Sequence, residues 1–183
     1  KYISMKYSSI AHFPQDIQDE LNFLVSEVLK RIPQTEYIIL YGSYARNKYV
    51  RRELRLEDHI PTYKISDYDI LVLTSGANLK NVDNTLDNIE DYFFAGKDFN
   101  KNTPVQFIKD DIKRFNKYIE EVRYFYTEEI KKEGIILYTS GNFKLARPRK
   151  LIFLQIQEQA QDYFYETFLR ANVFLKDAKS NFY

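Results

Sequence analysis

Apolar residues recur at helical spacing in two long stretches of the sequence. The first starts at Pro14 and Asp16 and ends at Ile32, directly before Pro33, and the second is Asn81–Phe94. Spacings of three and four residues place apolar side chains on one face of a helix. Shorter helices are expected at three more places: from Tyr44 to Arg46, after Asp110–Asp111, and over Tyr126–Glu133 with Gly134 as C-cap.

Four short runs rich in β-branched and aromatic residues indicate strands. They are Tyr37–Tyr41, Asp69–Leu73, Thr103–Ile108 and Ile135–Tyr138. The second run is apolar after its first residue, as in a strand of a sheet that is covered on both faces. Strands that alternate with helices predict an α/β (α+β) fold.

Two segments depart from this alternation. Asn47–Ile65 is rich in charge and is interpreted as an extended connection with a helical turn, not as a domain boundary. From Pro148 the chain has no glycine and no further proline, and its apolar spacing predicts one or two amphipathic helices. We therefore predict a first domain of residues 1–147 and a helical extension of residues 148–183, which either packs on that domain or begins another.

Composition narrows the class of protein. The chain has 183 residues, 44% of them hydrophobic and 29% charged, with a net charge of +1. These values suit a globular protein and give no global sign of a membrane or nucleic-acid surface, although they leave nucleic acid open as a partner. The absence of cysteine excludes disulfides and zinc–thiolate sites, and fits a cytoplasmic location. Within these 183 residues we see no signal-peptide pattern and no apolar run of membrane-spanning length.

Gly42–Ser43, at the end of the first strand, is a candidate phosphate site. Glycine lets the backbone approach a phosphate closely, and Ser43 adds an N–H and a hydroxyl donor. Arg46 is the best candidate for a further phosphate contact among the basic residues that follow. On its own, a Gly-Ser pair is more simply interpreted as a turn.

Asp67 and Asp69 form a candidate metal site at the start of the second strand. With one residue between them, both side chains point the same way. Two adjacent carboxylates repel unless a cation lies between them. Oxygen ligands on a strand suit Mg²⁺, with Mn²⁺ as an alternative, together with the phosphates of a nucleoside triphosphate. Alone, this pair is more simply a solvated strand end.

In combination, "GSYARN" followed by "SDYDILV" resembles the signature of the DNA polymerase β-like nucleotidyltransferases, and within them the small "minimal" nucleotidyltransferases. The resemblance implies a mixed sheet flanked by helices. It also implies that Gly42 and Ser43 contact phosphate and that Asp67 and Asp69 bind the catalytic metal. ATP or another nucleoside triphosphate would donate a nucleotidyl group to an acceptor that the sequence does not identify: protein, RNA or a small molecule.

The tail resembles the first helix of a HEPN domain, which often accompanies such enzymes as a fused domain or a partner chain. This resemblance implies a toxin–antitoxin context and a HEPN-like region that is truncated at Tyr183. A homodimer through the C-terminal helices is one expected partner. A HEPN-type RNA-processing protein with its active residues beyond this chain is a further alternative.

Two positions depart from the nucleotidyltransferase pattern. Asn47 stands where the family motif often has glycine, and asparagine tolerates the left-handed backbone that this position requires. Gln106 stands where many members carry a third carboxylate, and an amide can neither neutralise a metal nor act as a base. The candidate substitutes are Asp110 and Asp111. The alternative to an enzyme is therefore a degenerate module that binds nucleotide or a partner without transfer.

Overall fold

The computed structural model describes residues 9–57, 60–95 and 103–180, with the side chains of residues 55, 57, 60 and 61 left undescribed. The chain divides into two compact units, Lys1–Pro148 and Arg149–Tyr183. Among the described helices, none contains a stretch that is both long and apolar enough to cross a membrane.

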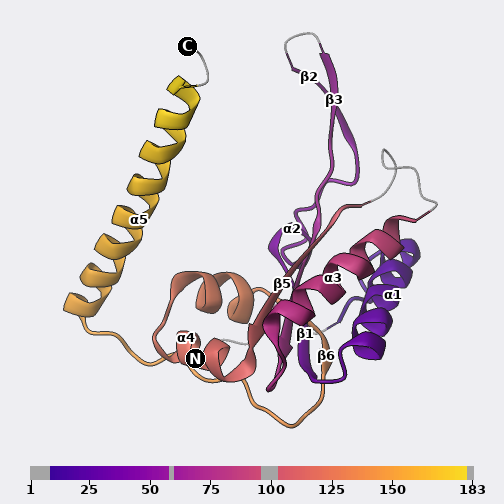
Figure 1. The fold of residues 1–183 in the computed structure, drawn as a ribbon, viewed down its shortest axis with the longest axis horizontal. Coiled ribbons are helices and arrows are strands. Elements are labelled where there is room, and N and C mark those ends of the chain that lie inside the picture. Colours follow the sequence, from indigo (N-terminus) through magenta and orange to yellow (C-terminus); the bar gives the residue numbers. More distant parts are fainter. Residues whose placement is uncertain (1–8, 58–59, 96–102, 181–183) are drawn as a thin grey trace. The chain divides into compact units, whose positions relative to one another are not determined.

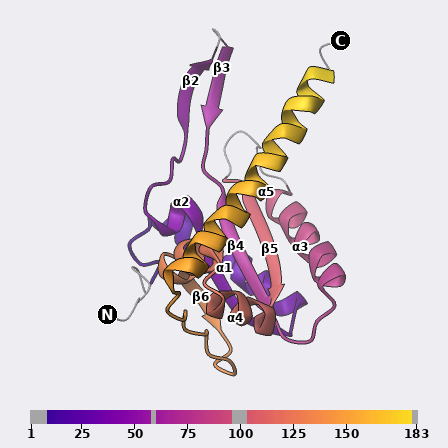
Figure 2. The same cartoon turned by 90° about the vertical axis from the view of Figure 1, so that its left-hand side faces the viewer.

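A four-stranded mixed sheet forms the centre of the first unit (Figure 1, Figure 2). Its strands are β1 (Thr35–Tyr41), β4 (Tyr68–Thr74), β5 (Val105–Asp111) and β6 (Ile135–Thr139), in the order β5-β4-β1-β6. β4 and β5 are parallel, whereas β1 pairs antiparallel with both β4 and β6. The predicted α/β class and the four predicted strands are confirmed.

Helices cover both faces of this sheet. α1 (Gln15–Arg31) and α3 (Leu79–Phe94) pack on one face, and α4 (Ile112–Glu120) and the π-helix η1 (Phe125–Lys132) pack on the other. The side chains of β4 point alternately to the two faces of the sheet. Ile70 and Val72 belong to the core under α1 and α3, whereas Leu71 and Leu73 belong to the core under α4 and η1. Asp69, two residues before Leu71, therefore belongs to the α4–η1 face of the sheet.

The ends of α1 and α4 follow the predicted signals in part. α1 has Pro14 as its N-cap and Ile32 as its C-cap, as its apolar spacing predicts. Asp111 caps α4, because its carboxylate accepts hydrogen bonds from two backbone N–H groups of the first turn. Asp110 is instead buried in β5 and accepts a hydrogen bond from Arg114 Nε.

The helix predicted over Tyr126–Glu133 is a π-helix that ends at Lys132, with Glu133 as its C-cap. Gly134 follows the cap instead of forming it, so its predicted capping role is wrong. It lies in a close approach between η1 and β1: a Cβ there would overlap the carbonyl oxygen of Ile130 and lie 2.8 Å from Ile39 Cγ2. Only a residue without a side chain lets η1 and β1 pack this closely.

The predicted connection over Asn47–Ile65 contains an antiparallel hairpin, β2 (Glu53–Glu57) and β3 (Ile60–Lys64). The expected helical turn is absent from the described part of this segment. Alternation explains the difference, since Leu54 and Leu56 are flanked by charged residues, which is a strand pattern. Leu54 lies opposite Tyr63, and both side chains are exposed.

The second unit contains one continuous helix, α5 (Phe153–Ser180), of 28 residues. The prediction of one or two helices in this tail is confirmed. None of its described residues is buried.

Candidate functional site

Gly42 connects β1 to the one-turn helix α2 (Gly42–Ala45) and lies directly against Asp69. Tyr41, the last residue of β1, pairs with Asp69 of β4, so the chain turns beside this carboxylate. Gly42 has φ +72°, a conformation that glycine adopts at least cost. A Cβ at Gly42 would overlap Asp69 Oδ2 and lie 2.8 Å from Asp69 Cγ. The two predicted motifs therefore meet at a point of contact.

The Gly-Ser turn is fixed to the core through Tyr44. This side chain is fully buried and stacks on Tyr49 with ring centroids 4.3 Å apart. The turn then closes when Lys48 N donates a hydrogen bond of 2.9 Å to the Ser43 carbonyl oxygen. Asn47 has φ +56°, so the left-handed conformation expected at this position is confirmed. The turn is thus held in place by packing and by its own hydrogen bonds.

Ser43 carries a polar atom without a partner. Its Oγ is inaccessible to solvent, and no hydrogen-bond partner for it lies in the described part of the chain. A buried hydroxyl left in this state costs about 1–3 kcal/mol. A hydroxyl that lacks a hydrogen bond at such a turn is suited to donate one to a ligand. A phosphate oxygen is a suitable acceptor for the Ser43 hydroxyl.

Asp67 is close enough to Asp69 for its charge to act on that carboxyl group. Burial raises the pKa of Asp69 to about 6, with a further upward contribution from the charge of Asp67, while Arg46 opposes the shift. Ser66, next to Asp67, is fixed by two hydrogen bonds with Val50: Ser66 N donates to the Val50 carbonyl at 2.8 Å, and Ser66 Oγ accepts from Val50 N at 2.9 Å. These bonds hold Asp67 at the base of the β2–β3 hairpin.

The parallel register of β4 and β5 places Gln106 beside Asp69. Gln106, the position predicted to correspond to a third carboxylate, thus neighbours Asp69 on the adjacent strand, and its side chain is an amide. Asp110 and Asp111 pair with Leu73 and Thr74 at the other end of β4, so neither can replace it. Within the described residues, no group of three or more His, Cys, Asp or Glu side chains is arranged to hold a metal.

Glu129 of η1 is an additional carboxylate whose charge reaches the site. It raises the pKa of Asp69, after burial and Asp67, and it contributes to the raised pKa of Tyr41, which burial and Asp69 dominate. η1 is oriented toward this region by Phe125, whose ring meets that of Tyr41 edge-on at 5.7 Å. No sequence signal marked Glu129, because one acidic residue on a helix is usually a solvated side chain.

Arg46 lies between two acidic groups. Its guanidinium is 3.5 Å from Glu133 Oε2, and its charge lowers the pKa of Asp69. Both partners of this ion pair are about one-third exposed. Arg46 is thus placed at the edge of the site, accessible to a ligand and held by a weak, partly solvated ion pair.

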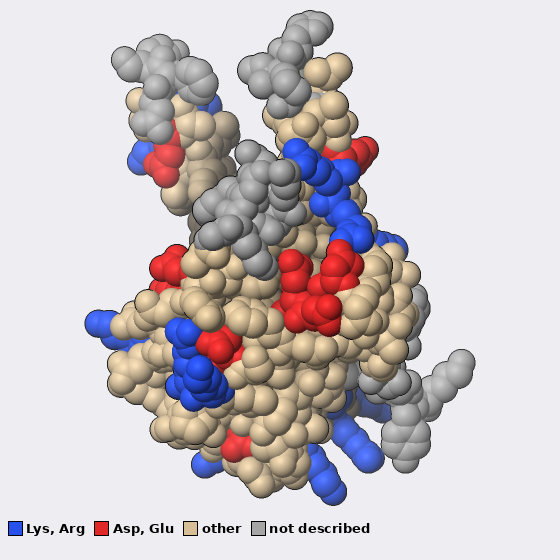
Figure 3. Space-filling model, turned by 90° about the vertical axis from the view of Figure 1, so that its right-hand side faces the viewer, with Lys and Arg blue, Asp and Glu red and all other residues tan. Residues whose placement is uncertain are grey.

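Two further arginines after the turn have local partners. Arg51 pairs with Asp16 of α1, and Arg52 stacks over the ring of Tyr63 at 4.0 Å. Figure 3 shows the acidic and basic side chains of one face as adjacent groups instead of one basic surface. These arginines therefore do not form a free phosphate-binding patch.

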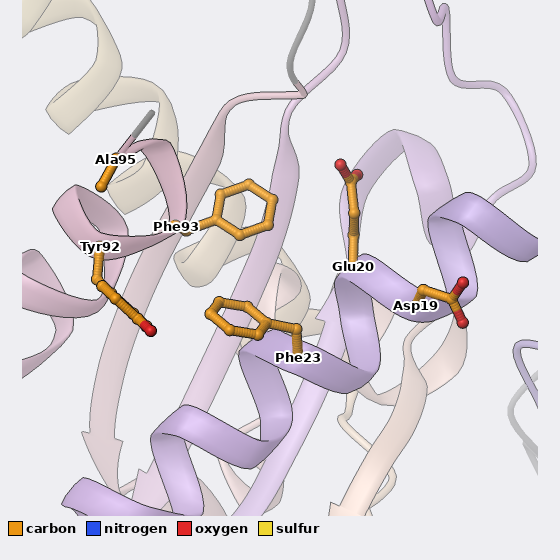
Figure 4. A pocket seen from close by; sticks show the side chains of 6 residues that line it. All are labelled: Asp19, Glu20, Phe23, Tyr92, Phe93 and Ala95. Carbon is orange, nitrogen blue, oxygen red and sulfur yellow. The ribbon is translucent and has the colours of Figure 1, made fainter. Parts of the chain in front are cut away.

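A cavity of about 380 Å³ lies between α1 and α3, lined by the aromatic residues Phe23, Tyr92 and Phe93 (Figure 4). Glu20 also lines it and accepts a hydrogen bond of 2.8 Å from the hydroxyl of Tyr68. None of the predicted phosphate or metal residues lines this cavity. It belongs to the α1–α3 face of the sheet, whereas Asp69 belongs to the other face.

Comparisons with known proteins give similarity in structure only. No family model matches the chain, and no curated protein matches it in sequence. Among solved structures, a candidate nucleotidyltransferase from Sulfolobus solfataricus is 18% identical over 73% of this chain and 96% of its own, with a TM-score of 0.36. A toxin–antitoxin structure with AMP-PNP is 13% identical over 86% of this chain and 97% of its own, also with a TM-score of 0.36.

Proposed function

We propose that this chain is a Mg²⁺-dependent nucleotidyltransferase of the DNA polymerase β-like class. It would transfer a nucleoside monophosphate from ATP, or another nucleoside triphosphate, to a hydroxyl of an acceptor. The observation that carries this proposal is the contact between Gly42 and Asp69. Two motifs from different strands come together at one turn, with a phosphate-type donor on one side and carboxylates on the other.

The residues of the chain fit a nucleotide and a divalent cation. Ser43 Oγ is buried and unpartnered within the described part of the chain, as suits a donor for a phosphate oxygen. Asp69 has a raised pKa because its charge is partly buried beside Asp67, and a cation bound to both would relieve that repulsion. Mg²⁺ commonly binds through one or two carboxylates together with substrate phosphates, so a third protein ligand is not required.

In the proposed reaction, an acceptor oxygen attacks the α-phosphorus. The bond from that phosphorus to the bridging oxygen of the β-phosphate breaks, and pyrophosphate leaves with its electron pair. A bound Mg²⁺ supplies charge neutralisation at the phosphates. Ser43 would donate to a phosphate oxygen, and Arg46 would exchange part of its ion pair with Glu133 for a phosphate contact. The acceptor proton passes to solvent or to a nearby base.

Gln106 favours a second candidate function. Since an amide cannot accept a proton, the chain lacks a general base at the position beside Asp69. A module that binds Mg²⁺–nucleotide without transferring it would retain Gly42, Ser43, Asp67 and Asp69 and lack only this base. The resemblance of residues 148–183 to a HEPN domain adds a toxin–antitoxin setting to either proposal.

Incubation with ATP labelled at the α-phosphate and Mg²⁺, together with a lysate as the source of acceptors, tests the function. The transferase proposal predicts an acceptor that becomes labelled with the wild-type chain and remains unlabelled with Asp67→Asn. Label carried at the γ-phosphate should not appear on the acceptor. Nucleotide binding without labelling of any acceptor would support the degenerate module instead.

A further inference from the structure

The cavity between α1 and α3 has a wall made of three aromatic rings. Phe23 of α1 lies against two residues of α3: its ring centroid is 6.0 Å from that of Phe93 and 5.8 Å from that of Tyr92, with a tilt of 35° in each pair. Phe93 is 2% exposed and Tyr92 is 53% exposed. The three rings therefore form one continuous aromatic wall that extends from the core to the surface.

One carboxylate is held at this aromatic wall. Tyr68 is fully buried in β4, and its hydroxyl donates a hydrogen bond of 2.8 Å to Glu20 Oε2. Glu20 lines the cavity together with Phe23 and Phe93, whereas Figure 4 shows that the Asp19 carboxylate points away from these rings. A carboxylate that a buried hydroxyl holds in place thus gives this end of the cavity its negative charge.

Among the described residues that line the cavity, none is basic. The guanidinium of Arg31 lies 5.3 Å from the centroid of the Tyr92 ring, which is within cation–π distance. It also donates two hydrogen bonds, of 3.0 and 2.6 Å, to Glu27 Oε2. Along α1, Arg31 is about 16 Å from Glu20, at a rise of 1.5 Å per residue. The aromatic wall therefore already attracts one cation at its Tyr92 end, far along the helix from Glu20.

These features favour an organic cation that has no N–H donors. A primary ammonium has three N–H donors, and each needs an acceptor when it leaves water. Among the described side chains that line the cavity, only Glu20 brings a carboxylate to the rings, so most of these donors would lose their partners. A quaternary ammonium has no donor to satisfy, and aromatic faces attract its charge. A cavity of about 380 Å³ is within the range of small-molecule sites.

We propose that this cavity binds a small quaternary ammonium compound. Its methylated nitrogen lies against the rings of Phe23 and Phe93, and its positive charge is balanced by Glu20. The cavity lies on the opposite face of the sheet from Asp69, and none of the predicted phosphate or metal residues lines it. This inference therefore does not depend on the nucleotidyltransferase proposal.

Calorimetric titration of the full chain with choline tests this inference, with 3,3-dimethylbutan-1-ol as the matched ligand. The two molecules have nearly the same shape, and only choline is charged. We expect choline to bind with a Kd in the millimolar range or tighter, and the alcohol to bind about tenfold more weakly. Methylammonium, a primary ammonium, should also bind more weakly than choline. All titrations are made at one ionic strength, so that screening is the same for each ligand.

Three results of these titrations would overturn the proposal. Equal binding of choline and the alcohol would show that the cavity selects shape and not charge. Tighter binding of methylammonium than of choline would show that N–H donors are satisfied there. No binding of choline would show that the cavity does not accept a quaternary ammonium.

Variants test whether choline binds in this cavity. Glu20→Gln keeps an oxygen acceptor for the Tyr68 hydroxyl and removes only the charge, so it should fold and bind choline about tenfold more weakly. Phe23→Leu keeps an apolar side chain without a ring and should weaken binding by a similar factor. Asp87→Asn removes an exposed acid of α3 that does not line the cavity, and this control should bind choline as wild type does.

NMR gives an independent measurement of the same contact. Ring currents should shift the N-methyl proton resonance of choline upfield in the presence of wild type, and less in the presence of Phe23→Leu. Equal choline affinity in wild type, Glu20→Gln and Phe23→Leu would place any binding elsewhere and overturn the proposal. Loss of affinity in Asp87→Asn equal to that in Glu20→Gln would show only a general effect of negative charge, and would also overturn it.

Discussion

Gly42 and Asp69 are in contact so close that any Cβ at position 42 would force the Asp69 carboxylate to move. A Cβ there would lie 2.8 Å from the Asp69 carboxyl carbon, which real Cβ atoms essentially never do. The Gly-Ser turn and the Asp-x-Asp strand are thereby parts of one structure. A nucleotide that binds the turn must also meet the charge of Asp69.

Gly42→Ala should displace Asp69 and abolish Mg²⁺–nucleotide binding. The positive φ of Gly42 costs an alanine about 1–2 kcal/mol, and the overlap with the carboxylate adds to this cost. Gly76→Ala is the matched control, because Gly76 has φ +70° and a Cβ added there would meet nothing within 4 Å. Both variants are compared by urea denaturation and by calorimetric nucleotide titration. Loss of nucleotide binding in both variants, or in neither, would show that the contact between Gly42 and Asp69 does not determine nucleotide binding.

The raised pKa of Asp69 predicts a pH-dependent stability in the absence of divalent cations. Its pKa is about 6 in the folded chain against 3.8 ordinarily, so the folded state holds the proton more tightly. Stability should therefore fall as pH rises from about 4 to 6. In Asp69→Asn this decrease should be smaller, whereas Asp162→Asn on α5 should leave it unchanged. An identical pH profile for Asp69→Asn and wild type would contradict the role of Asp69.

The same carboxylate predicts how Mg²⁺ binding depends on pH. Because protons compete with the cation for Asp69, affinity should fall up to about tenfold per pH unit below the Asp69 pKa of about 6 and level off above it. Removal of a nearby charge should shift the pH below which Mg²⁺ affinity falls, and the sign of the removed charge decides the direction. Glu129→Gln should lower it, and Arg46→Gln should raise it. Shifts of both variants in the same direction would count against the electrostatic origin of the raised pKa.

Gln106→Glu should restore a third carboxylate beside Asp69. The parallel register puts the new side chain next to that residue, so Mg²⁺ should bind more tightly, by about tenfold. Transfer activity should rise if the missing base limits it. Gln34→Glu, at an exposed turn position, is the control for added negative charge. Unchanged Mg²⁺ affinity in Gln106→Glu would show that position 106 does not face the cation.

Local patterns in the sequence were sufficient to predict the strands, α1 and α3. The expectation that the two motifs form one site, and the choice of Gln106 as the position to compare with a third carboxylate, came from the family resemblance; the register of β4 and β5 places Gln106 beside Asp69. Three-dimensional packing was needed for the rest. Glu129 and Glu133 reach the site only because η1 packs on β1, and the partner of Arg46 depends on that packing. The hairpin after Asn47 was not predicted because the many charged residues of this segment were interpreted as a connection, and the alternation of Leu54 and Leu56 with charged residues was not recognised as a strand pattern.

Titration of a non-hydrolysable ATP analogue tests most directly whether Gly42–Ser43 and Asp67–Asp69 form one Mg²⁺–nucleotide site. Calorimetry is performed on wild type, Ser43→Ala and Asp69→Asn, each with Mg²⁺ and with a chelator. We expect that wild type binds strongly only with Mg²⁺, that Ser43→Ala weakens binding, and that Asp69→Asn removes the effect of Mg²⁺. Binding by Asp69→Asn that equals wild type and still depends on Mg²⁺ would contradict a shared site.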